Sequence, residues 1–352
     1  MKQHFLVTGG AGFIGSNYVQ RLLLRGEKVT VYDNLSRSGA RRNVDWLRQN
    51  FGENAFHLIV GDVREASLLA EAARDADVIV HLAGQVAVTT SVTDPRDDFE
   101  ANALGTFNAL EAARLSVRNP IFIYASTNKV YGGMEDVELV EEATRWRYRH
   151  LNHGCPETQP IDFHSPYGNS KGSGDQYTRD YSRIYGLRSV VFRQSCIAGP
   201  RQFGIEDQGW VAWFIIAAIT GRPITVYGDG KQVRDILFVE DLLNAYDAAV
   251  EKIDVAAGQI YNLGGGPENV MSIWSEFRPI LERLLGRPIE VGRGDWRPGD
   301  QRVFYADIRK AERELSWKPM IGVEEGIGRL FKWVQENRNL FYNAPGHKLR
   351  SP

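Results

Sequence analysis

Thr8-Gly9-Gly10-Ala11-Gly12-Phe13-Ile14-Gly15 stands between an apolar run at residues 5–8 and a helical pattern at residues 14–25. Gly9 permits a tight turn, Gly12 lets the backbone approach a pyrophosphate, and Gly15 allows a helix to pack closely on a strand. The start of that helix offers free N–H groups and a partial positive charge to phosphates. The pattern predicts a dinucleotide-binding turn, and a simple glycine-rich turn is the alternative.

Short β-branched runs continue after this turn. They lie at residues 28–32, 56–60, 78–82 and 120–124, and an Ala-rich helical stretch occupies residues 102–115. Continuous apolar strands separated by helices indicate a parallel sheet covered on both faces. We therefore expect an α/β fold with a doubly wound parallel sheet of the Rossmann type.

The second half of the chain changes character. Residues 139–163 are polar and show no clear period, which indicates a long insertion near a site. Beyond residue 193, short runs such as 224–227 lie among helices. We expect an NAD-binding domain of residues 1–192 plus about 236–263. A smaller α/β substrate-binding domain would comprise about 193–235 and 264–340, and residues 341–352 would form a surface tail.

Composition excludes several classes of protein. The 352 residues carry 42 Lys+Arg against 44 Asp+Glu, a net charge of −2, which argues against a nucleic-acid partner. The apolar run at residues 210–219 falls short of the roughly 20 residues that span a bilayer, so no membrane partner is expected. Two cysteines are too few for a disulfide framework, and His153 and Cys155 lack a usual zinc spacing. The strand predicted at residues 5–8 leaves no room for a signal peptide, so we expect a cytoplasmic protein. We expect no metal site.

Asp33 follows the second predicted strand, 18 residues after Gly15. A carboxylate there can accept both ribose hydroxyls of an adenosine and would repel a 2′-phosphate, so NAD is favoured over NADP. Arg37 and the neighbouring arginines weaken this choice. Asp62-Val63 and Leu82-Ala83-Gly84 follow later strands and are candidate cofactor contacts, with loop residues that touch no ligand as the alternative.

Tyr167 and Lys171 lie four residues apart, which places a phenol and an ammonium on one helical face. The ammonium, with an oxidised nicotinamide nearby, is expected to lower the pKa of the phenol until it acts as a base near neutral pH. Thr127, at the end of a buried strand, supplies a hydroxyl. We predict Thr127, Tyr167 and Lys171 as catalytic residues, with a solvent-facing Tyr/Lys pair as the alternative.

Together these motifs resemble the extended short-chain dehydrogenase/reductase family of nucleotide-sugar epimerases and dehydratases, over nearly the whole chain. Residues 228–235 and 297–300 are similar to the nucleotide-diphosphate elements of that family. The resemblance implies that Arg234 and Arg297 donate to the diphosphate. Residues 127–132, 162–168 and 199–210 are most similar to family members that invert C2 of a CDP-linked hexose.

The motifs and the resemblance give two sets of candidate binding residues. The cofactor set is Gly9, Gly12, Phe13, Ile14, Gly15, Asp33, Asn34, Ser36, Arg37, Asp62, Val63, Leu82, Ala83, Gly84, Gln85, Asn102, Tyr167 and Lys171. The substrate set is Thr127, Asn128, Lys129, His164, Gln194, Ser195, Arg201, Gln202, Gln208, Trp210, Arg234, Arg297 and Asp300. Simple packing is the alternative for His164 and Trp210.

Two positions depart from the pattern of the family. Dehydratases of this family carry Asp-Glu after the threonine, whereas Asn128 and Lys129 stand here and are no natural acid/base pair for β-elimination. Cys196 stands where many relatives have an Asn near the substrate diphosphate.

The resemblance implies an NAD-dependent nucleotide-sugar epimerase. It would oxidise C2 of a CDP-hexose transiently to a 2-keto sugar, re-reduce it on the opposite face, and form a homodimer or homotetramer. Three alternatives stay open: a UDP-sugar 4-epimerase, another nucleotide-sugar oxidoreductase of the family, and a non-catalytic NAD-sensing protein.

Overall fold

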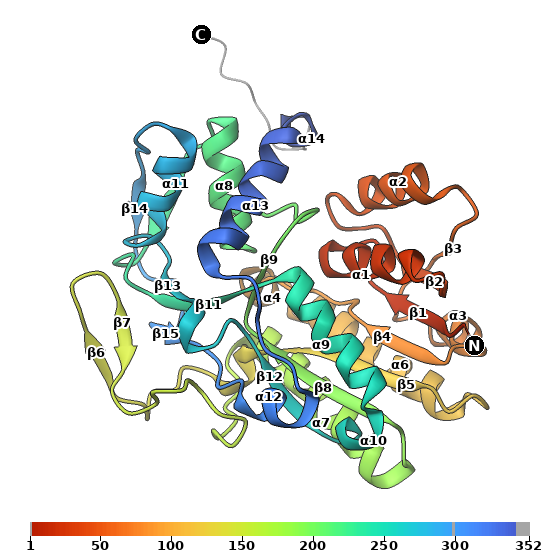
Figure 1. The fold of residues 1–352 in the computed structure, drawn as a ribbon. Coiled ribbons are helices and arrows are strands. Elements are labelled where there is room, and N and C mark those ends of the chain that lie inside the picture. Colours follow the sequence, from red (N-terminus) through yellow and green to blue (C-terminus); the bar gives the residue numbers. More distant parts are fainter. Residues whose placement is uncertain (1, 298–299, 343–352) are drawn as a thin grey trace.

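The computed structural model describes residues 2–297 and 300–342, and its largest element is a seven-stranded parallel sheet (Figure 1). The strand order is β12-β8-β5-β4-β1-β2-β3. The strands are β1 (His4–Thr8), β2 (Lys28–Asp33), β3 (His57–Val60), β4 (Val78–His81), β5 (Ile121–Thr127), β8 (Ser189–Gln194) and β12 (Ile260–Leu263). This arrangement confirms the predicted doubly wound α/β fold.

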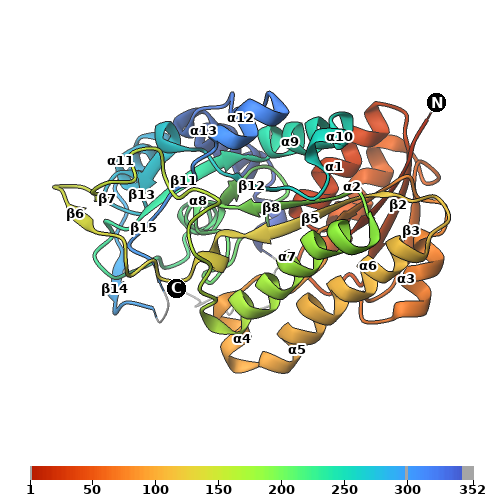
Figure 2. The same cartoon turned by 90° about the horizontal axis from the view of Figure 1, so that it is seen from below.

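Helices cover both faces of this sheet (Figure 2). One face carries α1 (Phe13–Leu24), α2 (Ala40–Phe51), α9 (Val239–Glu251) and α10 (Ile253–Ala256); the other carries α3 (Ala66–Ala73), α6 (Gly105–Leu115) and α7 (Ser165–Tyr185). Alternate residues of β1 belong to different cores: Phe5 and Val7 pack with the first group, and Leu6 packs with the second. This division follows from the two-residue side-chain period of a strand.

Strand β5 extends past the apolar run at residues 120–124 and ends at Thr127, as expected for a threonine at the end of a buried strand. Ser126 pairs with Arg193 and Thr127 pairs with Gln194 on β8. The expected helix at residues 102–115 is divided: a π-helical turn, Glu100–Leu104, precedes α6. Two short helices, α4 (Val88–Thr93) and α5 (Pro95–Phe99), lead into this turn.

A smaller set of strands and helices lies beyond the carboxyl edge of the large sheet. It contains β9 (Cys196–Ala198), β11 (Val233–Phe238), β13 (Val270–Ser272) and β15 (Val303–Phe304) in one sheet, and β10 (Thr225–Tyr227) paired with β14 (Gly292–Gly294). Helices α8 (Trp210–Thr220), α11 (Phe277–Leu285) and α13 (Val323–Glu336) enclose a second core with these strands. The boundary placed near residue 236 falls inside β11.

The stretch 139–163, expected to be irregular, contains a small hairpin of β6 (Leu139–Glu141) and β7 (Trp146–Tyr148). Its strands have only three residues each, too few for a recognisable alternation. Trp146 donates from Nε1 to Asp229, and the buried Tyr148 donates to the carbonyl of Val303. The hairpin is therefore attached to the smaller part of the molecule (Figure 1).

The expected tail begins later than residue 341. Helix α14 (Asn339–Tyr342) buries Phe341 against Phe203 and Trp333, with ring centroids 5.4 Å and 5.9 Å apart. Residues 343–352 of that prediction lie outside the described residues. The remaining elements are α12 (Arg309–Leu315) and the 3₁₀ turns η2 (Asn128–Tyr131) and η3 (Pro267–Asn269).

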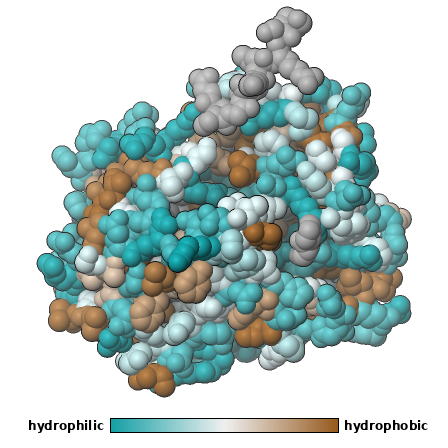
Figure 3. All heavy atoms as spheres, turned by 180° about the vertical axis from the view of Figure 1, so that it is seen from behind, coloured by the Kyte–Doolittle hydropathy of each residue, from teal (hydrophilic) through white to brown (hydrophobic). Residues whose placement is uncertain are grey.

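Within the described part of the chain, no helix is long and apolar enough to cross a membrane. On the face opposite that of Figure 1, hydrophobic residues form small patches separated by hydrophilic surface (Figure 3).

Candidate active site

The glycine turn between β1 and α1 has no room for side chains. Gly9 has φ +68°, and a Cβ added there would lie 2.7 Å from the amide nitrogen of Ala83. A Cβ on Gly15 would lie only 2.2 Å from the carbonyl oxygen of Gly9. Gly12 is the N-cap of α1, and no side chain of residues 2–297 or 300–342 caps this helix. The first N–H groups of α1 are thus left for an anionic ligand.

A cavity of about 660 Å³ opens above this turn. Every residue of the expected cofactor set except Asn102 lines this cavity, and these lining residues include Tyr167 and Lys171. Asn102 contacts the cavity wall from behind, since its Nδ2 donates to the carbonyl of Gln85 at 3.0 Å. The size, the glycine cradle and the uncapped helix together fit a dinucleotide.

Asp33 lies at the rim of this cavity with its carboxylate fixed by the backbone. It accepts from the N–H of Ala11 at 3.0 Å and of Leu35 at 2.8 Å. Burial raises the pKa of Asp33, and these two bonds oppose the rise. Each carboxylate oxygen keeps a further lone pair, so ribose hydroxyls can still be accepted. Arg37 lines the same cavity and donates to Gln208, with no carboxylate partner within the described ranges.

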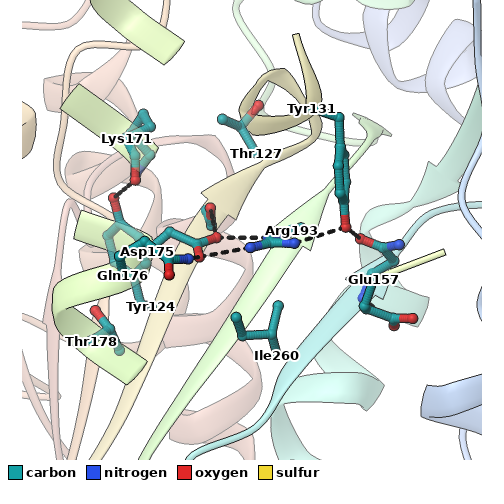
Figure 4. Close-up of polar contacts among 12 residues, drawn as sticks. Tyr124, Thr127, Tyr131, Glu157, Lys171, Asp175, Gln176, Thr178, Arg193 and Ile260 are labelled. Atoms are coloured by element: carbon teal, nitrogen blue, oxygen red, sulfur yellow. Dashed lines mark hydrogen bonds and ion pairs between the residues drawn. The ribbon is translucent and has the colours of Figure 1, made fainter. Parts of the chain in front are cut away.

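Thr127, Tyr167 and Lys171 meet at the inner end of the cavity. Thr127 ends β5, whereas Tyr167 and Lys171 lie on the first turns of α7, and all three are buried. The Thr127 hydroxyl donates to Oδ1 of Asn128 at 3.4 Å and lies near enough to the phenol of Tyr167 to influence its pKa. The ammonium of Lys171 lies 4.3 Å from the ring centroid of Tyr124, and Figure 4 labels both residues.

Burial is the largest influence on the pKa values of Tyr167 and Lys171. It raises the pKa of Tyr167 to about 12, and the nearby Thr127 only partly opposes this. It lowers the pKa of Lys171 to about 7, against the charges of Asp175 and Asp98. The expected lowering of the Tyr167 pKa involves both the ammonium of Lys171 and an oxidised nicotinamide, and it stays a prediction; among the residues of the chain itself, burial is the largest influence on this phenol.

A second cavity of about 240 Å³ adjoins the first, and Gln208, Gly209 and Trp210 line both. Arg234 and Arg297 line the second cavity, each paired with an aspartate. Arg234 contacts Asp300 at 2.7 Å, and Arg297 contacts Asp207 at 2.9 Å. Two guanidinium groups at one cavity suit a diphosphate, whose oxygens can replace the carboxylates.

Lys129 also lines the second cavity, two residues after Thr127. Burial, together with the nearby charge of Arg234, lowers the pKa of Lys129 to about 8. Lys129 thus places a third, readily deprotonated cation beside the two guanidinium groups, between Thr127 and the second cavity.

The other expected substrate residues are distributed unevenly. Gln194, Ser195 and Gln202 line the larger cavity. Asn128 and His164 lie outside both linings as far as the described residues define them; Asn128 donates to Gln301, and His164 contacts Asp162.

Arg201 lines the larger cavity and not the smaller one, and it lies on the side of α1. Its Nη2 donates to Asn17 and Gln20, both at 2.6 Å, and its guanidinium lies 4.1 Å from the ring centroid of Trp46. Burial lowers the pKa of Arg201 to about 10. This position does not bring Arg201 together with Arg234 and Arg297.

Several lining residues were missed by the sequence analysis. In the larger cavity they include Ser126, Cys196 and Phe203, and in the smaller one Asp207, Phe214, Thr225 and Tyr227. Tyr227 directly precedes the diphosphate element at residues 228–235, which was an available signal. Cys196 was noticed as a departure, and its thiol accepts from Nε1 of Trp210 at 3.4 Å.

Comparison with known proteins agrees with this geometry. The profile of the family described as GDP-mannose 4,6 dehydratase matches residues 6–330. The chain is 42% identical to CDP-paratose 2-epimerase of Salmonella typhi over 336 residues, covering 94% of this chain and 98% of that protein.

Two solved structures are similar over almost the whole fold. UDP-glucose 4-epimerase of Thermotoga maritima, solved with UDP-glucose, has a TM-score of 0.81 and 29% identity, covering 95% of this chain and 99% of its own. A dTDP-glucose 4,6-dehydratase of Streptomyces venezuelae, solved with NAD, has a TM-score of 0.82 and 30% identity, covering 95% and 98%.

Gly15→Ala is expected to weaken binding of NAD, because the new Cβ would displace the turn at Gly9. Overpacking of this kind costs roughly 1–3 kcal/mol, and each 1.4 kcal/mol corresponds to about tenfold in affinity. Titration calorimetry on protein stripped of cofactor measures the change.

Gly328→Ala in α13 is the matched control, because no described atom lies within 4 Å of the Cβ it would add. It should leave the affinity unchanged. Equal affinities of wild type and Gly15→Ala would show that the turn does not hold the dinucleotide.

Proposed function

Since the chain belongs to the GDP-mannose 4,6-dehydratase family within the extended short-chain dehydrogenases/reductases, we propose that it is an NAD-dependent nucleotide-sugar epimerase that inverts C2 of a CDP-linked hexose. The observation that carries this proposal is the junction of the two cavities. Thr127, Tyr167 and Lys171 lie in the larger one, and two arginines suited to a diphosphate lie in the smaller one.

The two cavities give the substrate one orientation. Arg234 and Arg297 would bind the diphosphate, exchanging Asp300 and Asp207 for phosphate oxygens. The hexose would then extend past Lys129 and Trp210 toward Thr127 and Tyr167. The residues that line the larger cavity would hold NAD, which when bound would supply the oxidation and the re-reduction of the carbinol carbon by hydride transfer.

Proton transfer is the task of the chain itself. The phenolate oxygen of Tyr167 takes the proton of the sugar hydroxyl. Thr127 donates a hydrogen bond to the sugar oxygen while this proton leaves. Lys171 stabilises the phenolate by its charge. On re-reduction, Tyr167 gives the proton back to the ketone oxygen, which becomes the new hydroxyl. Because Thr127, Tyr167 and Lys171 are buried, little water would reach a ketone held between them.

The residues after Thr127 favour epimerisation over loss of water. β-Elimination needs one group to remove a proton and another to protonate the departing hydroxyl. Asn128 is an amide that donates to Gln301, and Lys129 lines the diphosphate cavity. The 42% identity to CDP-paratose 2-epimerase supports the same choice and supports C2 as the carbon inverted.

The second candidate is a UDP-sugar 4-epimerase. The similarity to the UDP-glucose 4-epimerase of Thermotoga maritima favours it, with a TM-score of 0.81. Both reactions need the same proton and hydride transfers, so only the bound sugar distinguishes them.

Proton NMR of CDP-paratose mixed with the protein, without added cofactor, tests the proposal. We expect a new anomeric signal whose coupling to the C2 proton has changed, because C2 is inverted and NAD stays bound between turnovers. Tyr167→Phe, which lacks the phenol oxygen, should lower turnover by at least about 100-fold. An unchanged spectrum from wild type with NAD bound would refute C2 inversion; UDP-glucose would then be tested for 4-epimerisation.

The pH dependence follows from the coupled ionisation of Tyr167 and Lys171. With pKa values of about 12 for Tyr167 and about 7 for Lys171, the pair loses its first proton near neutral pH. The active form, phenolate beside ammonium, has lost that one proton. We expect kcat/KM to rise with pH through an apparent pKa near about 7 and then level off.

Lys171→Met should remove this plateau. The phenol of Tyr167 would then titrate alone, so kcat/KM would be low at neutral pH and still rise beyond about pH 9. A wild-type profile that falls between about pH 6 and pH 8 would contradict the assignment.

For assembly, we propose the homodimer or homotetramer that the family likeness implies, formed through the outer face of α5, α6 and α7 (Figure 2). Phe99, Phe107, Tyr177 and Ile184 are exposed there, with Phe107 and Tyr177 in edge-to-face contact at 6.0 Å. Two copies related by a two-fold axis would bury these residues against each other.

Phe107→Asp combined with Tyr177→Asp is expected to yield monomers in sedimentation velocity at a concentration where wild type is dimeric or larger. Val117→Asp changes an exposed apolar residue just after α6 and should keep the wild-type mass. A monomeric wild type would contradict the proposal.

A further inference from the structure

Helix α7 carries three buried side chains at four-residue intervals, Tyr167, Lys171 and Asp175. Side chains spaced by four lie on one face of a helix. The first two reach the larger cavity, whereas Asp175 lies a turn further along, between the helix and the large sheet. Asp175 therefore connects the catalytic face of α7 to the strands beneath it.

The Asp175 carboxylate contacts both strands that meet beneath α7. Arg193 of β8 donates to both of its oxygens, from Nε at 2.9 Å and from Nη2 at 3.0 Å. Ser126 of β5 donates from Oγ at 2.7 Å. Neither Asp175 nor Arg193 is exposed by more than 3%. Because Ser126 directly precedes Thr127, this bond fixes the helix beside the catalytic threonine.

Arg193 continues the network on the other side of Thr127 (Figure 4). Its Nη1 donates to the hydroxyl of Tyr131 at 3.0 Å, and Tyr131 donates to Asn262 of β12 at 2.7 Å. Tyr131 ends the η2 turn that follows Thr127. The chain segment carrying Thr127 is thus held before and after it by the same ion pair.

Asp175 also acts on the charge of Lys171. It is one of two carboxylates that oppose the lowering of the Lys171 pKa, the other being Asp98 of α5. The remaining groups around the ammonium carry little charge. Tyr124 of β5 and Tyr167 are phenols with raised pKa values, and burial lowers the pKa of His81 on β4 to about 3.

We propose that the buried Asp175–Arg193 pair is a positioning device for the reaction, fixing the rotation and height of α7 so that Tyr167 and Lys171 face Thr127. The inference rests on the proposed function, because it assigns that reaction to these three residues. Buried ion pairs are weak sources of stability, and apolar residues can hold a helix on a sheet equally well. Only the bidentate, directional contacts fix the geometry.

The double substitution Asp175→Leu with Arg193→Met tests this role, because it removes both charges together and avoids an uncompensated buried ion. We expect a folded protein that retains NAD and melts within a few degrees of wild type. Its kcat for CDP-paratose should fall about 100-fold, since a displacement near 1 Å at the reacting groups has that effect. The KM should change little, because the arginines of the second cavity are untouched.

Tyr181→Phe is the matched control. It removes a hydrogen bond of 2.8 Å from the same helix to Glu111 on α6, and Tyr181 lines neither of the two cavities. This variant should keep the wild-type kcat. A double variant with wild-type kcat, or one whose loss of kcat is matched by loss of NAD and of melting temperature, would overturn the proposal.

Asp175→Asn gives a readout that needs no substrate. Removing the negative charge should lower the pKa of Lys171, measured by lysine side-chain carbon-13 NMR of the NAD-bound protein. If wild type fails to epimerise CDP-paratose, the proposed function is wrong, and the NMR measurement still tests whether Asp175 acts on Lys171. An unchanged Lys171 pKa in Asp175→Asn would overturn the inferred link between Asp175 and Lys171.

Discussion

The parallel direction of the seven strands is the constraint on which the site depends. Because all strands of the large sheet run the same way, their carboxyl ends lie at one edge. The glycine turn after β1, Asp33 at the end of β2, Thr127 at the end of β5 and Gln194 at the end of β8 therefore line one cavity. Residues separated by more than 180 positions in the chain become neighbours without any local sequence signal.

Desolvation sets the chemistry that this cavity can support. A buried phenol resists losing its proton and a buried ammonium resists keeping one, so Tyr167 and Lys171 each disfavour their charged form when considered separately. In the proposed mechanism, the phenolate of Tyr167 and the ammonium of Lys171 would stabilise each other. Asp175 and Asp98 shift that balance toward the ammonium, and Arg193 compensates the charge of Asp175.

The loop at residues 199–209 connects the two halves of the site. Gln208 accepts from Arg37 on the cofactor side, and Asp207 pairs with Arg297 on the diphosphate side. Phe203 packs on Gly39, where an added Cβ would lie 2.1 Å from its ring, and on the buried Phe341. The same short segment thus shapes both cavities.

Local pattern determined much of this protein. The alternation of apolar runs and helices, the glycine turn and the four-residue spacing of Tyr167 and Lys171 are short-range features, so the sequence predicts the doubly wound sheet and the cavity that holds these groups. The tertiary structure alone decided the position of Arg201 against α1, the burial of Phe341 and the pairing of Asp175 with Arg193. Each depends on contacts between distant segments, and on the desolvation those contacts impose, which no local spacing encodes.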